Sequence, residues 1–315
     1  MTAPGPVLVT GGLGLVGRAL VRRLVEEGRE VTVIDHPSTG RPGVLDGLPG
    51  VTLVEGDIRR AGTFRRLGRR HWAGAYHLAA QANVAESVKD PVNDFEINAV
   101  GTLNVLEWAR RHLRGPLVYP STVAVYAPGA SLPLREDALL GPSSPYGASK
   151  LAGEALVRAY GRAYGLSSVV VRLFNVYGEG MNKYVIHDLI RKLMRDPGRL
   201  EILGDGEQVR DYLHAEDAAR ALTLVAAKAP PGCVLNLGSG VPVRIKDLAD
   251  RIIAAMGLSA VRKVYTGRSW AGDIQAWYAD TSALEALGFH PRISLEAGLA
   301  RVVADLGAAP HPETE

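Results

Sequence analysis

Short apolar runs rich in valine, isoleucine and leucine alternate with longer stretches of mixed polarity through the first 175 residues. Continuous apolar runs are typical of strands buried on both faces of a parallel sheet. We expect such strands at residues 7–12, 30–35, 51–57, 74–80, 116–127 and 167–175. Apolar positions three and four residues apart predict helices at 15–27, 94–113 and 145–165. This alternation predicts an α/β fold whose parallel sheet is covered by helices on both faces.

The alternation of apolar strands and amphipathic helices ends after residue 175. Turn-rich segments at 177–183 and 203–212 flank a helical pattern at about 184–195, and a helix at 214–228 and a strand at 233–240 are expected to return to the main sheet. We therefore predict a larger lobe made of residues 1–175 plus about 214–240. A smaller, discontinuous C-terminal α/β lobe, which holds the substrate, is predicted from about 176–213 plus 241–307, followed by a flexible tail at 308–315.

The segment VLVTGGLGLVG places Gly11, Gly14 and Gly17 directly after the first strand and at the start of the first helix. Glycines there let the backbone turn tightly and approach a pyrophosphate, which the free N–H groups of the helix N-terminus then hold. Asp35 ends the second strand, 18 residues beyond Gly17, where an acid binds the adenosine ribose 2′-hydroxyl. A carboxylate there repels a 2′-phosphate, which favours NAD over NADP. The larger lobe is thus predicted to be a doubly wound Rossmann sheet that binds NAD.

Composition narrows the class of protein. Of the 315 residues, 47% are hydrophobic and 22% are charged, as in a globular enzyme, and no apolar run approaches the length of a membrane span. The net charge is only +3 and the arginine pairs are scattered, so we expect no nucleic-acid partner. The single cysteine, Cys233, forms no disulfide within the chain, and no cysteine and histidine spacing predicts a metal site. These features favour a reducing, cytoplasmic location.

Tyr146 and Lys150 lie four residues apart in a helical pattern, so they share one face of the helix that Pro145 opens. An ammonium close to a phenol favours the phenolate, and we therefore expect Lys150 to lower the pKa of Tyr146 toward neutral pH. A tyrosine of this kind can act as a general acid and base. An ordinary aromatic and lysine pair on a helix surface has the same spacing.

Seven segments in chain order carry a more specific pattern: TGGLGLVG, HLAAQANV, PSTVAVYA, YGASK, RLFNVYGEG, VRDYLHAEDAARA and NLGSG. Together they resemble the extended short-chain dehydrogenase/reductase family over roughly residues 7–300, in particular its nucleotide-sugar epimerases and dehydratases. The pattern is closest to that of the UDP-glucose 4-epimerases. The resemblance implies a Rossmann fold, NAD as cofactor and a nucleotide-sugar substrate.

Carried over by position, the resemblance implies three catalytic residues: Tyr146 as acid and base, Lys150 beside the nicotinamide ribose, and Thr122 on the sugar C4 oxygen. It implies cofactor contacts at Gly11, Gly14, Leu15, Val16, Gly17, Asp35, His36, Ser38, Asp57, Ile58, Leu78, Ala79, Ala80, Gln81, Asn98, Ser121, Tyr146, Lys150 and Phe174. It implies substrate contacts at Thr122, Asn175, Asn182, Lys183, Leu203, Arg210, Arg268, Asp273 and Trp277. Arg268 stands two residues earlier than the diphosphate-binding arginine of relatives, whose register here holds Trp270.

The two residues after Thr122 select among the reactions of the family. Dehydratases carry Asp-Glu there and decarboxylases carry Glu at the second position, whereas this chain has Val123 and Ala124, which cannot transfer a proton. The resemblance then implies a 4-epimerase, in which the C4 hydride passes to NAD, leaving a 4-keto sugar, and returns to the opposite face. A net dehydrogenase or 4-ketoreductase, and a non-catalytic NAD-binding protein, are alternatives.

Trp277 holds the position of a gate residue whose bulk limits the sugar C2 substituent, which predicts poor acceptance of N-acetyl sugars. Uronic-acid epimerases of the family have an arginine shortly after the YG turn, where this chain has Glu179 and Lys183. Because Glu179 is expected to oppose Lys183, UDP-glucose and UDP-galactose rank above UDP-glucuronate, whose 4-epimerisation is an alternative. Relatives often dimerise through the helices that match 94–113 and 145–165, so we expect a homodimer with no membrane partner.

Overall fold

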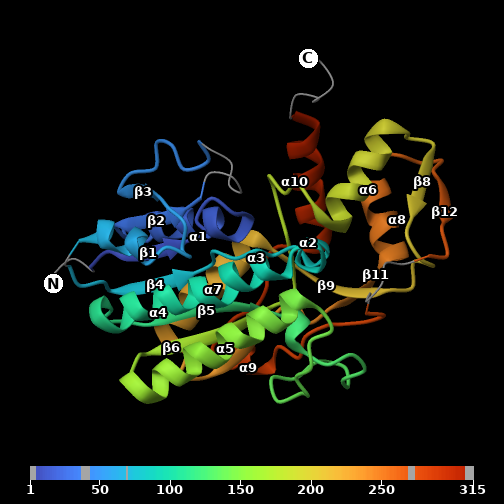
Figure 1. Ribbon diagram of the computed structural model, residues 1–315. Coiled ribbons are helices and arrows are strands. Elements are labelled where there is room, and N and C mark those ends of the chain that lie inside the picture. The colour runs from blue at the N-terminus through green and yellow to red at the C-terminus, as the bar shows by residue number, and fades with distance from the viewer. Residues whose placement is uncertain (1–4, 37–42, 69, 269–273, 309–315) are drawn as a thin grey trace.

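The computed structural model describes residues 5–36, 43–68, 70–268 and 274–308. The larger lobe is built on a seven-stranded sheet in which every neighbouring pair runs parallel (Figure 1). From one edge to the other the strands are β10 (Val234–Leu237), β6 (Ser168–Leu173), β5 (Leu117–Thr122), β4 (Gly74–His77), β1 (Val7–Thr10), β2 (Val31–Asp35) and β3 (Val51–Glu55). The chain runs outward from β1 to β3 and then crosses back to β4, so the strand order reverses between β1 and β4. The predicted doubly wound Rossmann sheet is confirmed.

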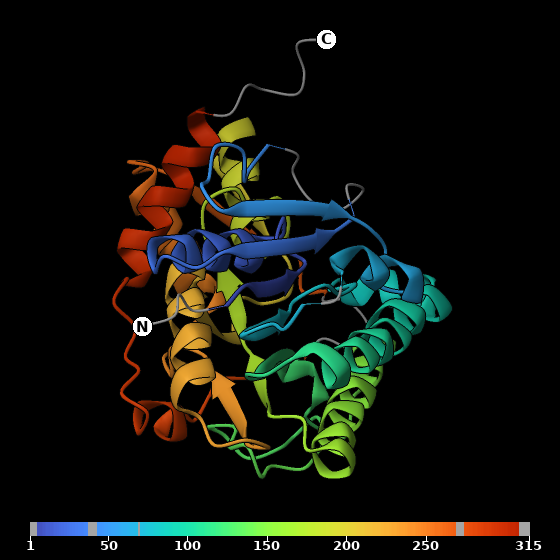
Figure 2. The same ribbon diagram turned by 90° about the vertical axis from the view of Figure 1, so that its left-hand side faces the viewer.

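Helices cover both faces of this sheet. α1 (Leu15–Glu26) and α7 (Ala215–Lys228) pack together on one face and α4 (Gly101–His112) and α5 (Pro145–Tyr164) on the other, as Figure 2 shows. Side chains alternate along the strands, so that Val7 and Val9 share a core with α1 and α7, whereas Leu8 shares a core with α4. Both strand faces are apolar because both are covered, which explains the continuous apolar runs in the sequence.

Two predicted elements are divided in the structure. The helix expected at 94–113 consists of α3 (Pro91–Phe95), a π-helical turn η2 (Glu96–Val100) and α4, and it is preceded by the short helix α2 (Val84–Lys89). The strand expected at 116–127 ends at Thr122, and the chain then forms the 3-10 turn η3 (Val123–Val125). Another 3-10 helix, η1 (Ala61–Leu67), follows β3. The Thr122 hydroxyl accepts a hydrogen bond from the Ala124 N–H at 3.2 Å and so caps η3.

The smaller lobe is built from two small sheets and the helices α6 (Tyr184–Arg195), α8 (Ile245–Ala255) and α10 (Leu295–Ala308), which bury a separate apolar core. In one sheet, β9 (Val209–His214) pairs in parallel with β7 (Asn175–Tyr177) and antiparallel with β11 (Pro242–Arg244). In the other, β8 (Arg199–Ile202) pairs in parallel with β12 (Arg262–Tyr265). The prediction of a turn over 203–212 is wrong from Val209 onward, because β9 is the buried central strand of its sheet.

The chain crosses between the lobes more often than the sequence predicts. Leu284 of the short helix α9 (Ser282–Glu285) and nearby Phe289 are buried in the core of the larger lobe. The segment 282–289 therefore departs from the predicted assignment of 241–307 to the smaller lobe. α10 continues through Ala308, the first residue of the predicted tail, and residues 309–315 lie outside the described part of the chain.

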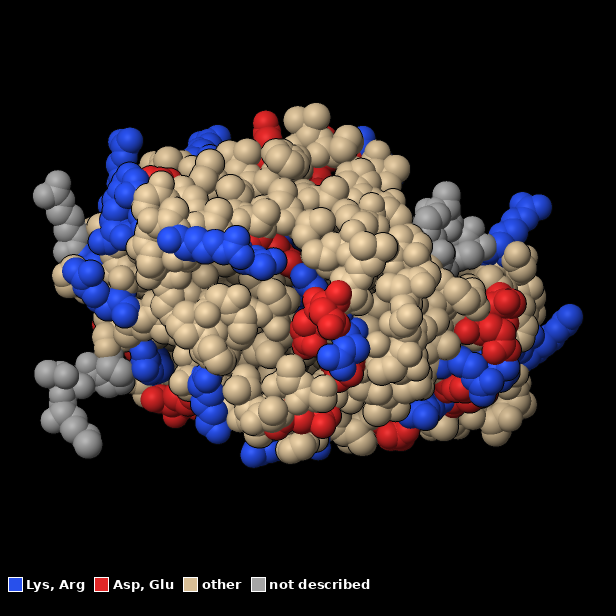
Figure 3. Space-filling model, turned by 90° about the horizontal axis from the view of Figure 1, so that it is seen from below, with Lys and Arg blue, Asp and Glu red and all other residues tan. Residues whose placement is uncertain are grey.

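Charged side chains are dispersed over the surface. On the face seen from below in Figure 3, basic and acidic side chains are interspersed and separated by wide uncharged areas. Many basic side chains are paired, as Arg110 and Arg111 are with Glu107. This arrangement agrees with the scattered arginine pairs of the sequence. Within the described residues, no helix combines the length and the apolarity needed to cross a bilayer.

Candidate active site

The glycine-rich segment lies where the strand order reverses, between β1 and β4. Gly11 has a φ of +76°, in the left-handed region that favours glycine. A Cβ atom on Gly17 would lie 2.0 Å from the Gly11 carbonyl oxygen, so α1 can start this close to the loop only with glycine there. Gly14 is the N-cap of α1, and no side chain caps the helix. The N–H groups of its first turn therefore face an anion such as a pyrophosphate without competition from a capping side chain.

Asp35 is fixed beside this cradle at the end of β2. The Asp35 carboxylate accepts hydrogen bonds from the Leu13 and His36 N–H groups, both at 2.7 Å. Burial raises the pKa of Asp35, and the two backbone hydrogen bonds oppose that rise. The carboxylate thus lies where the adenosine ribose of a dinucleotide is expected. His36 is exposed at the start of the following loop, and Ser38 lies outside the described residues.

The π-helical turn η2 positions Asn98 against the loop that follows β4. The Asn98 carboxamide accepts a hydrogen bond from the Gln81 N–H at 2.9 Å and donates one to the Gln81 carbonyl oxygen at 3.0 Å. It also donates to the Ser149 hydroxyl on α5 and the Asp94 carboxylate on α3. Asn98 therefore holds the predicted cofactor loop against α5, which carries Lys150. π turns of this kind are frequent at functional sites.

The other predicted cofactor residues divide into two groups. Those at the carboxyl ends of β1 and β4 are half-buried around the cradle: Leu15, Val16, Leu78, Ala79, Ala80 and Gln81. Those of the second group have partners within the protein. Asp57 pairs with Arg59 at 2.6 Å, Ile58 is buried in the core that includes α4, and Phe174 is buried in the apolar cluster of Val123.

Thr122 and Tyr146 meet at the carboxyl end of β5. α5 begins one residue before Tyr146, and the Ser144 hydroxyl caps it by accepting from the Gly147 N–H at 3.1 Å. The Tyr146 N–H in turn donates to the Ser87 hydroxyl of α2 at 3.1 Å. The Thr122 hydroxyl lies close enough to the Tyr146 phenol to lower the pKa of that phenol. Two hydroxyl groups from different elements therefore lie near each other in the site.

Lys150 lies one helical turn beyond Tyr146 and is only 3% exposed. Its ammonium donates to the Pro120 carbonyl oxygen at 2.7 Å and stands 4.2 Å from the centre of the Tyr119 ring. Both contacts favour the charged ammonium, and both come from β5, the strand that ends at Thr122. The strand and the helix thus fix the three predicted catalytic residues relative to one another.

Burial governs the ionisation of Tyr146 and Lys150. It raises the pKa of Tyr146, and the nearby Thr122 hydroxyl lowers that pKa by less. It lowers the pKa of Lys150 to about 7, although the carboxylates of Glu154 and Asp94 oppose this. The expectation that Lys150 brings the Tyr146 pKa toward neutral pH is therefore wrong for the polypeptide alone, because desolvation of the phenol is the larger effect. A further positive charge beside the phenol is needed to favour the phenolate.

Three predicted substrate residues converge from distant parts of the chain. The Trp277 indole N–H donates to the Asn175 Oδ1 at 2.9 Å, and the Arg210 guanidinium lies 4.4 Å from the centre of the Trp277 ring. Trp277 also packs against the apolar cluster that contains Val123, the residue after Thr122. The structure thus brings Asn175, Arg210 and Trp277 together next to the end of β5.

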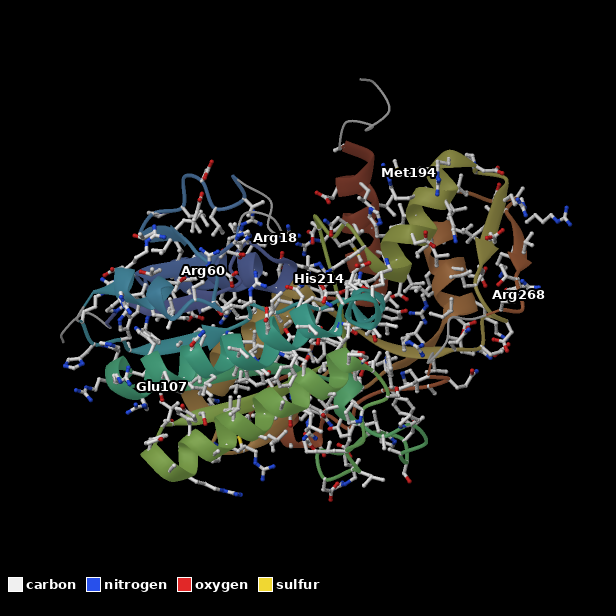
Figure 4. All side chains as sticks on the ribbon, viewed as in Figure 1. Arg18, Arg60, Glu107, Met194, His214 and Arg268 are labelled. Carbon is white, nitrogen blue, oxygen red and sulfur yellow. The ribbon has the colours of Figure 1, made fainter. Side chains whose placement is uncertain are left out.

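The other predicted substrate residues lie further out. The Gly204 N–H donates to the Arg268 carbonyl oxygen at 2.9 Å, so Leu203 and Arg268 are neighbours beyond the ends of β8 and β12. Arg268 is at the outer edge of the smaller lobe in Figure 4. Asn182 and Lys183 are exposed on the loop before α6. Asp273 and Trp270 lie outside the described residues.

Tyr184 is a site residue that sequence reasoning missed. Among the described residues it is the only one other than glycine with a positive φ, of 73°. Its hydroxyl donates to the Ala82 carbonyl oxygen at 2.7 Å, which joins the loop before α6 to the loop after β4. Tyr184 is also close enough to Tyr146 to raise the pKa of that phenol. No local pattern around Tyr184 indicates this contact between the two lobes.

Glu179 does not act on Lys183 in the way the sequence suggested. Its carboxylate accepts hydrogen bonds from the His214 ring at 2.9 Å and from the Arg301 guanidinium. Arg301 also pairs with Glu216. Glu179, His214 and Glu216 are spaced like the ligands of a metal ion, but Arg301 already supplies a cation to both carboxylates. Glu179 therefore gives no electrostatic reason to discount Lys183 as a substrate contact.

A cavity of about 310 Å³ lies beside this network, between α1, α7 and α10. Arg18 of α1 faces it and donates to the Glu179 carbonyl oxygen, and Figure 4 labels Arg18 and His214 near the junction of the two lobes. Leu15 is the only predicted site residue among those lining the cavity. The cavity therefore lies behind the first helix and away from Thr122, Tyr146 and Lys150.

The described residues fit a dinucleotide. The Ser121 hydroxyl is buried and has no hydrogen-bond partner among the described residues, as expected of a group that a cofactor satisfies. Gly11 and Gly17 let the loop and α1 approach each other more closely than a Cβ atom would permit, and the buried Lys150 ammonium can donate to hydroxyl groups of a ribose. The sequence model of the NAD-dependent epimerase/dehydratase family matches residues 7–238.

Known proteins resemble the chain along nearly its whole length. It is 34% identical over 302 residues to a putative UDP-glucose 4-epimerase of Methanocaldococcus jannaschii, covering 94% of this chain and 97% of that one. It is 33% identical to a dTDP-glucose 4,6-dehydratase of Streptomyces antibioticus, covering 94% and 91%. The crystal structure of a UDP-glucose 4-epimerase of Thermotoga maritima with UDP-glucose matches with a TM-score of 0.90 and 31% identity, over 96% and 98% of the two chains.

Proposed function

The chain belongs to the NAD-dependent epimerase/dehydratase family, and from that premise we propose that it is a nucleotide-sugar 4-epimerase that interconverts UDP-glucose and UDP-galactose. The observation that carries the proposal is the end of β5. The Thr122 hydroxyl lies close to the Tyr146 phenol there, while the next two residues, Val123 and Ala124, have no group that can transfer a proton. This set is sufficient for reversible oxidation at one carbon and supplies nothing for elimination.

The proposed roles follow from the geometry. Thr122 and Tyr146 hold the C4 hydroxyl of the sugar, and the Tyr146 oxygen takes its proton when C4 is oxidised. Bound NAD supplies the hydride acceptor and, in its oxidised form, the positive charge that favours the Tyr146 phenolate. Lys150 stays beside the phenol through its contact with Pro120 and holds the nicotinamide ribose. After the keto sugar has rotated in the site, C4 would take the hydride back on its opposite face, and Tyr146 returns the proton to the C4 oxygen.

The proposal extends to the remaining predicted residues. The cradle of Gly11, Gly14 and Gly17 binds the pyrophosphate of NAD, and Asp35 binds the adenosine ribose. These groups belong to the larger lobe, residues 1–175 plus about 214–240. The smaller lobe holds the UDP moiety through Asn175 and the residues around it. We place the enzyme in the cytoplasm, where the free and half-buried Cys233 stays reduced.

The sugar is proposed to lack an N-acetyl group. The Trp277 indole is tied to Asn175 and stacked on Arg210, so its bulk has little freedom to move away from a C2 substituent. This supports UDP-glucose and UDP-galactose over their N-acetyl counterparts. UDP-glucuronate belongs in the same substrate panel, since Glu179 is engaged with His214 and leaves Lys183 able to meet a carboxylate.

The proposal is tested by incubating the purified enzyme with UDP-glucose and no added cofactor, and separating the products by ion-exchange chromatography. UDP-galactose should accumulate to equilibrium without net formation of NADH. A stoichiometric rise in NADH absorbance would instead identify a dehydrogenase, and a 4-keto-6-deoxy product a dehydratase. No conversion of any nucleotide hexose by enzyme that contains NAD would refute an epimerase.

We propose a homodimer formed through α3, α4 and α5. Large apolar side chains are exposed on these helices and on the adjoining α2, with Val92 68% and Phe95 51% exposed, together with Val88, Val100 and Leu103. The helices are those through which relatives of the extended family pair. Analytical ultracentrifugation should give a dimer, and Phe95→Glu should give a monomer. A monomeric wild-type enzyme would contradict this assembly.

A further inference from the structure

The backbone around Trp277 is anchored on both sides. The backbone N–H of Trp277 donates to the Val209 carbonyl oxygen of β9 at 3.1 Å, and the backbone N–H of Leu134 donates to the Tyr278 carbonyl oxygen at 2.9 Å. One residue further, the Ala279 N–H donates to the buried Asp211 carboxylate at 3.1 Å. The segment is thus fixed between β9 and the loop of Leu134, and Trp277 has a defined position relative to β7 and β9.

The indole determines which way the Asn175 side chain faces. An indole N–H only donates, so the atom of the Asn175 carboxamide that meets it at 2.9 Å must be the oxygen. The Asn175 Nδ2 group is then turned away from Trp277, and it has no hydrogen-bond partner within the described part of the chain. Asn175 consequently presents only N–H donors to whatever approaches it.

The same indole also contacts Arg210, which lies over the face of the Trp277 ring. The guanidinium lies 4.4 Å from the ring centre, and its Nη1 donates to the Val209 carbonyl oxygen at 2.8 Å. A guanidinium held over an aromatic ring is restricted in position, so the indole helps to determine where the Arg210 charge lies. Arg210 is 7% exposed, and removing the ring would leave this buried cation with fewer constraints.

We propose that Trp277 is a positioning residue for the diphosphate of the substrate. It holds Asn175 with its amide donors turned away from the indole and keeps the Arg210 charge beside the ring, which suits an anionic group that accepts hydrogen bonds. This inference rests on the proposed function and deepens it, because it explains how two residues 35 positions apart in the sequence are oriented by a third. Trp277 thus acts on nucleotide affinity through its neighbours, in addition to its proposed effect on the C2 substituent.

The test compares the affinity of UDP for variants of the NAD-containing enzyme by isothermal titration calorimetry. Trp277→Phe keeps a ring for Arg210 and loses the indole N–H, and should weaken UDP binding about 5- to 10-fold, the worth of one hydrogen bond. Trp277→Leu loses both contacts and should weaken it by about 100-fold. Trp108→Phe is the matched control, because the buried Trp108 Nε1 has no hydrogen-bond partner in the described part of the chain, and the UDP affinity of this variant should equal that of the wild type.

Two readouts separate positioning from a general structural effect. Trp277→Phe and Asn175→Ala should be strongly non-additive in UDP affinity, because the indole acts through Asn175. With UDP-glucose, Trp277→Phe should raise KM far more than it lowers kcat, whereas a displaced active site would lower both.

Asn175→Asp gives an independent check without altering Trp277. The aspartate keeps an acceptor for the indole, so the NMR signal of the Trp277 indole N–H, one of four such tryptophan signals, should not shift. The affinity for UDP should fall, because the amide donors of Asn175 are gone. Additive effects, or wild-type UDP affinity in Trp277→Phe, would overturn the inference. If wild-type enzyme binds no UDP, both this inference and the proposed substrate fail; if it binds UDP without epimerising it, only the proposed reaction fails.

Discussion

Replacing Lys150 by methionine should abolish epimerisation and yet stabilise the NAD-free protein at neutral pH. Lys150 is 3% exposed, and burial lowers its pKa from 10.5 to about 7. Its ammonium is therefore held in a place that disfavours charge. The free energy of unfolding includes that penalty, and a neutral side chain of similar length removes it.

The size of the effect follows from the two pKa values. The difference between 10.5 and about 7 corresponds to roughly 5 kcal/mol at acid pH, because one pKa unit is worth about 1.4 kcal/mol. Methionine also loses the hydrogen bond to the Pro120 carbonyl oxygen, which offsets about 1 kcal/mol. At pH 7 the lysine is half protonated when folded and nearly fully when unfolded. Lys150→Met should therefore gain about 3 kcal/mol there.

The pH dependence has a definite sign. Below pH 7 the lysine is charged in both states and the gain of the variant is complete. Between pH 7 and pH 10.5 only the unfolded wild-type lysine binds the proton, so wild-type stability rises with pH relative to the variant by about 1.4 kcal/mol per pH unit. By pH 9.5 the advantage of Lys150→Met should have almost vanished.

Urea unfolding of NAD-free protein, followed by circular dichroism at pH 7 and pH 9.5, measures both quantities. Lys89→Met is the matched control, because the Lys89 side chain is 71% exposed, and it should change stability by less than about 0.5 kcal/mol at either pH. A variant less stable than the wild type at pH 7 would refute the assignment of a buried, depressed lysine. So would a difference of equal size at both pH values.

Three further changes test the site and its support. Gly17→Ala places a Cβ 2.0 Å from the Gly11 carbonyl oxygen, so NAD content, measured after heat release, should fall to near zero; full NAD content would contradict the close approach of α1. Tyr146→Phe should lower kcat by about 10²- to 10⁴-fold with UDP affinity unchanged, and a loss below tenfold would remove Tyr146 as the acid and base. Glu154→Gln leaves the Arg172 guanidinium unpaired, with both side chains only 2% exposed, so urea unfolding should show a loss of about 3–5 kcal/mol; a loss under 1 kcal/mol would mean the charge finds another partner.

The order of elements in the larger lobe could be predicted because its strands are buried on both faces. Residues 7–9 are all apolar and residues 31–34 are interrupted only by Thr32, and the helices between strands keep a separate period. The glycine cradle could also be predicted, because the positive φ of Gly11 and the close approach of Gly17 to the Gly11 carbonyl oxygen arise within the cradle itself. Local rules were sufficient wherever the local backbone alone determines the residue type.

Features that depend on tertiary packing could not be predicted in the same way. The π turn that positions Asn98 has the same polarity pattern as an ordinary helix, and the direction of the Tyr146 pKa shift is determined by burial in the folded protein. The hydrogen bond between Trp277 and Asn175 joins residues 102 positions apart, and each residue alone gives no sign of the other. The sequence predicted Trp277 and Asn175 as substrate contacts, but it did not indicate that Trp277 orients Asn175.

The central claim is that a hydride leaves C4 of the sugar and returns to C4. It is tested most directly with UDP-glucose deuterated at C4, converted by the purified enzyme in ordinary water and examined by NMR. The deuterium should be found at C4 of UDP-galactose, undiluted by solvent. Deuterium at C6 of a deoxy sugar, on released NADH, or lost to water would contradict the claim.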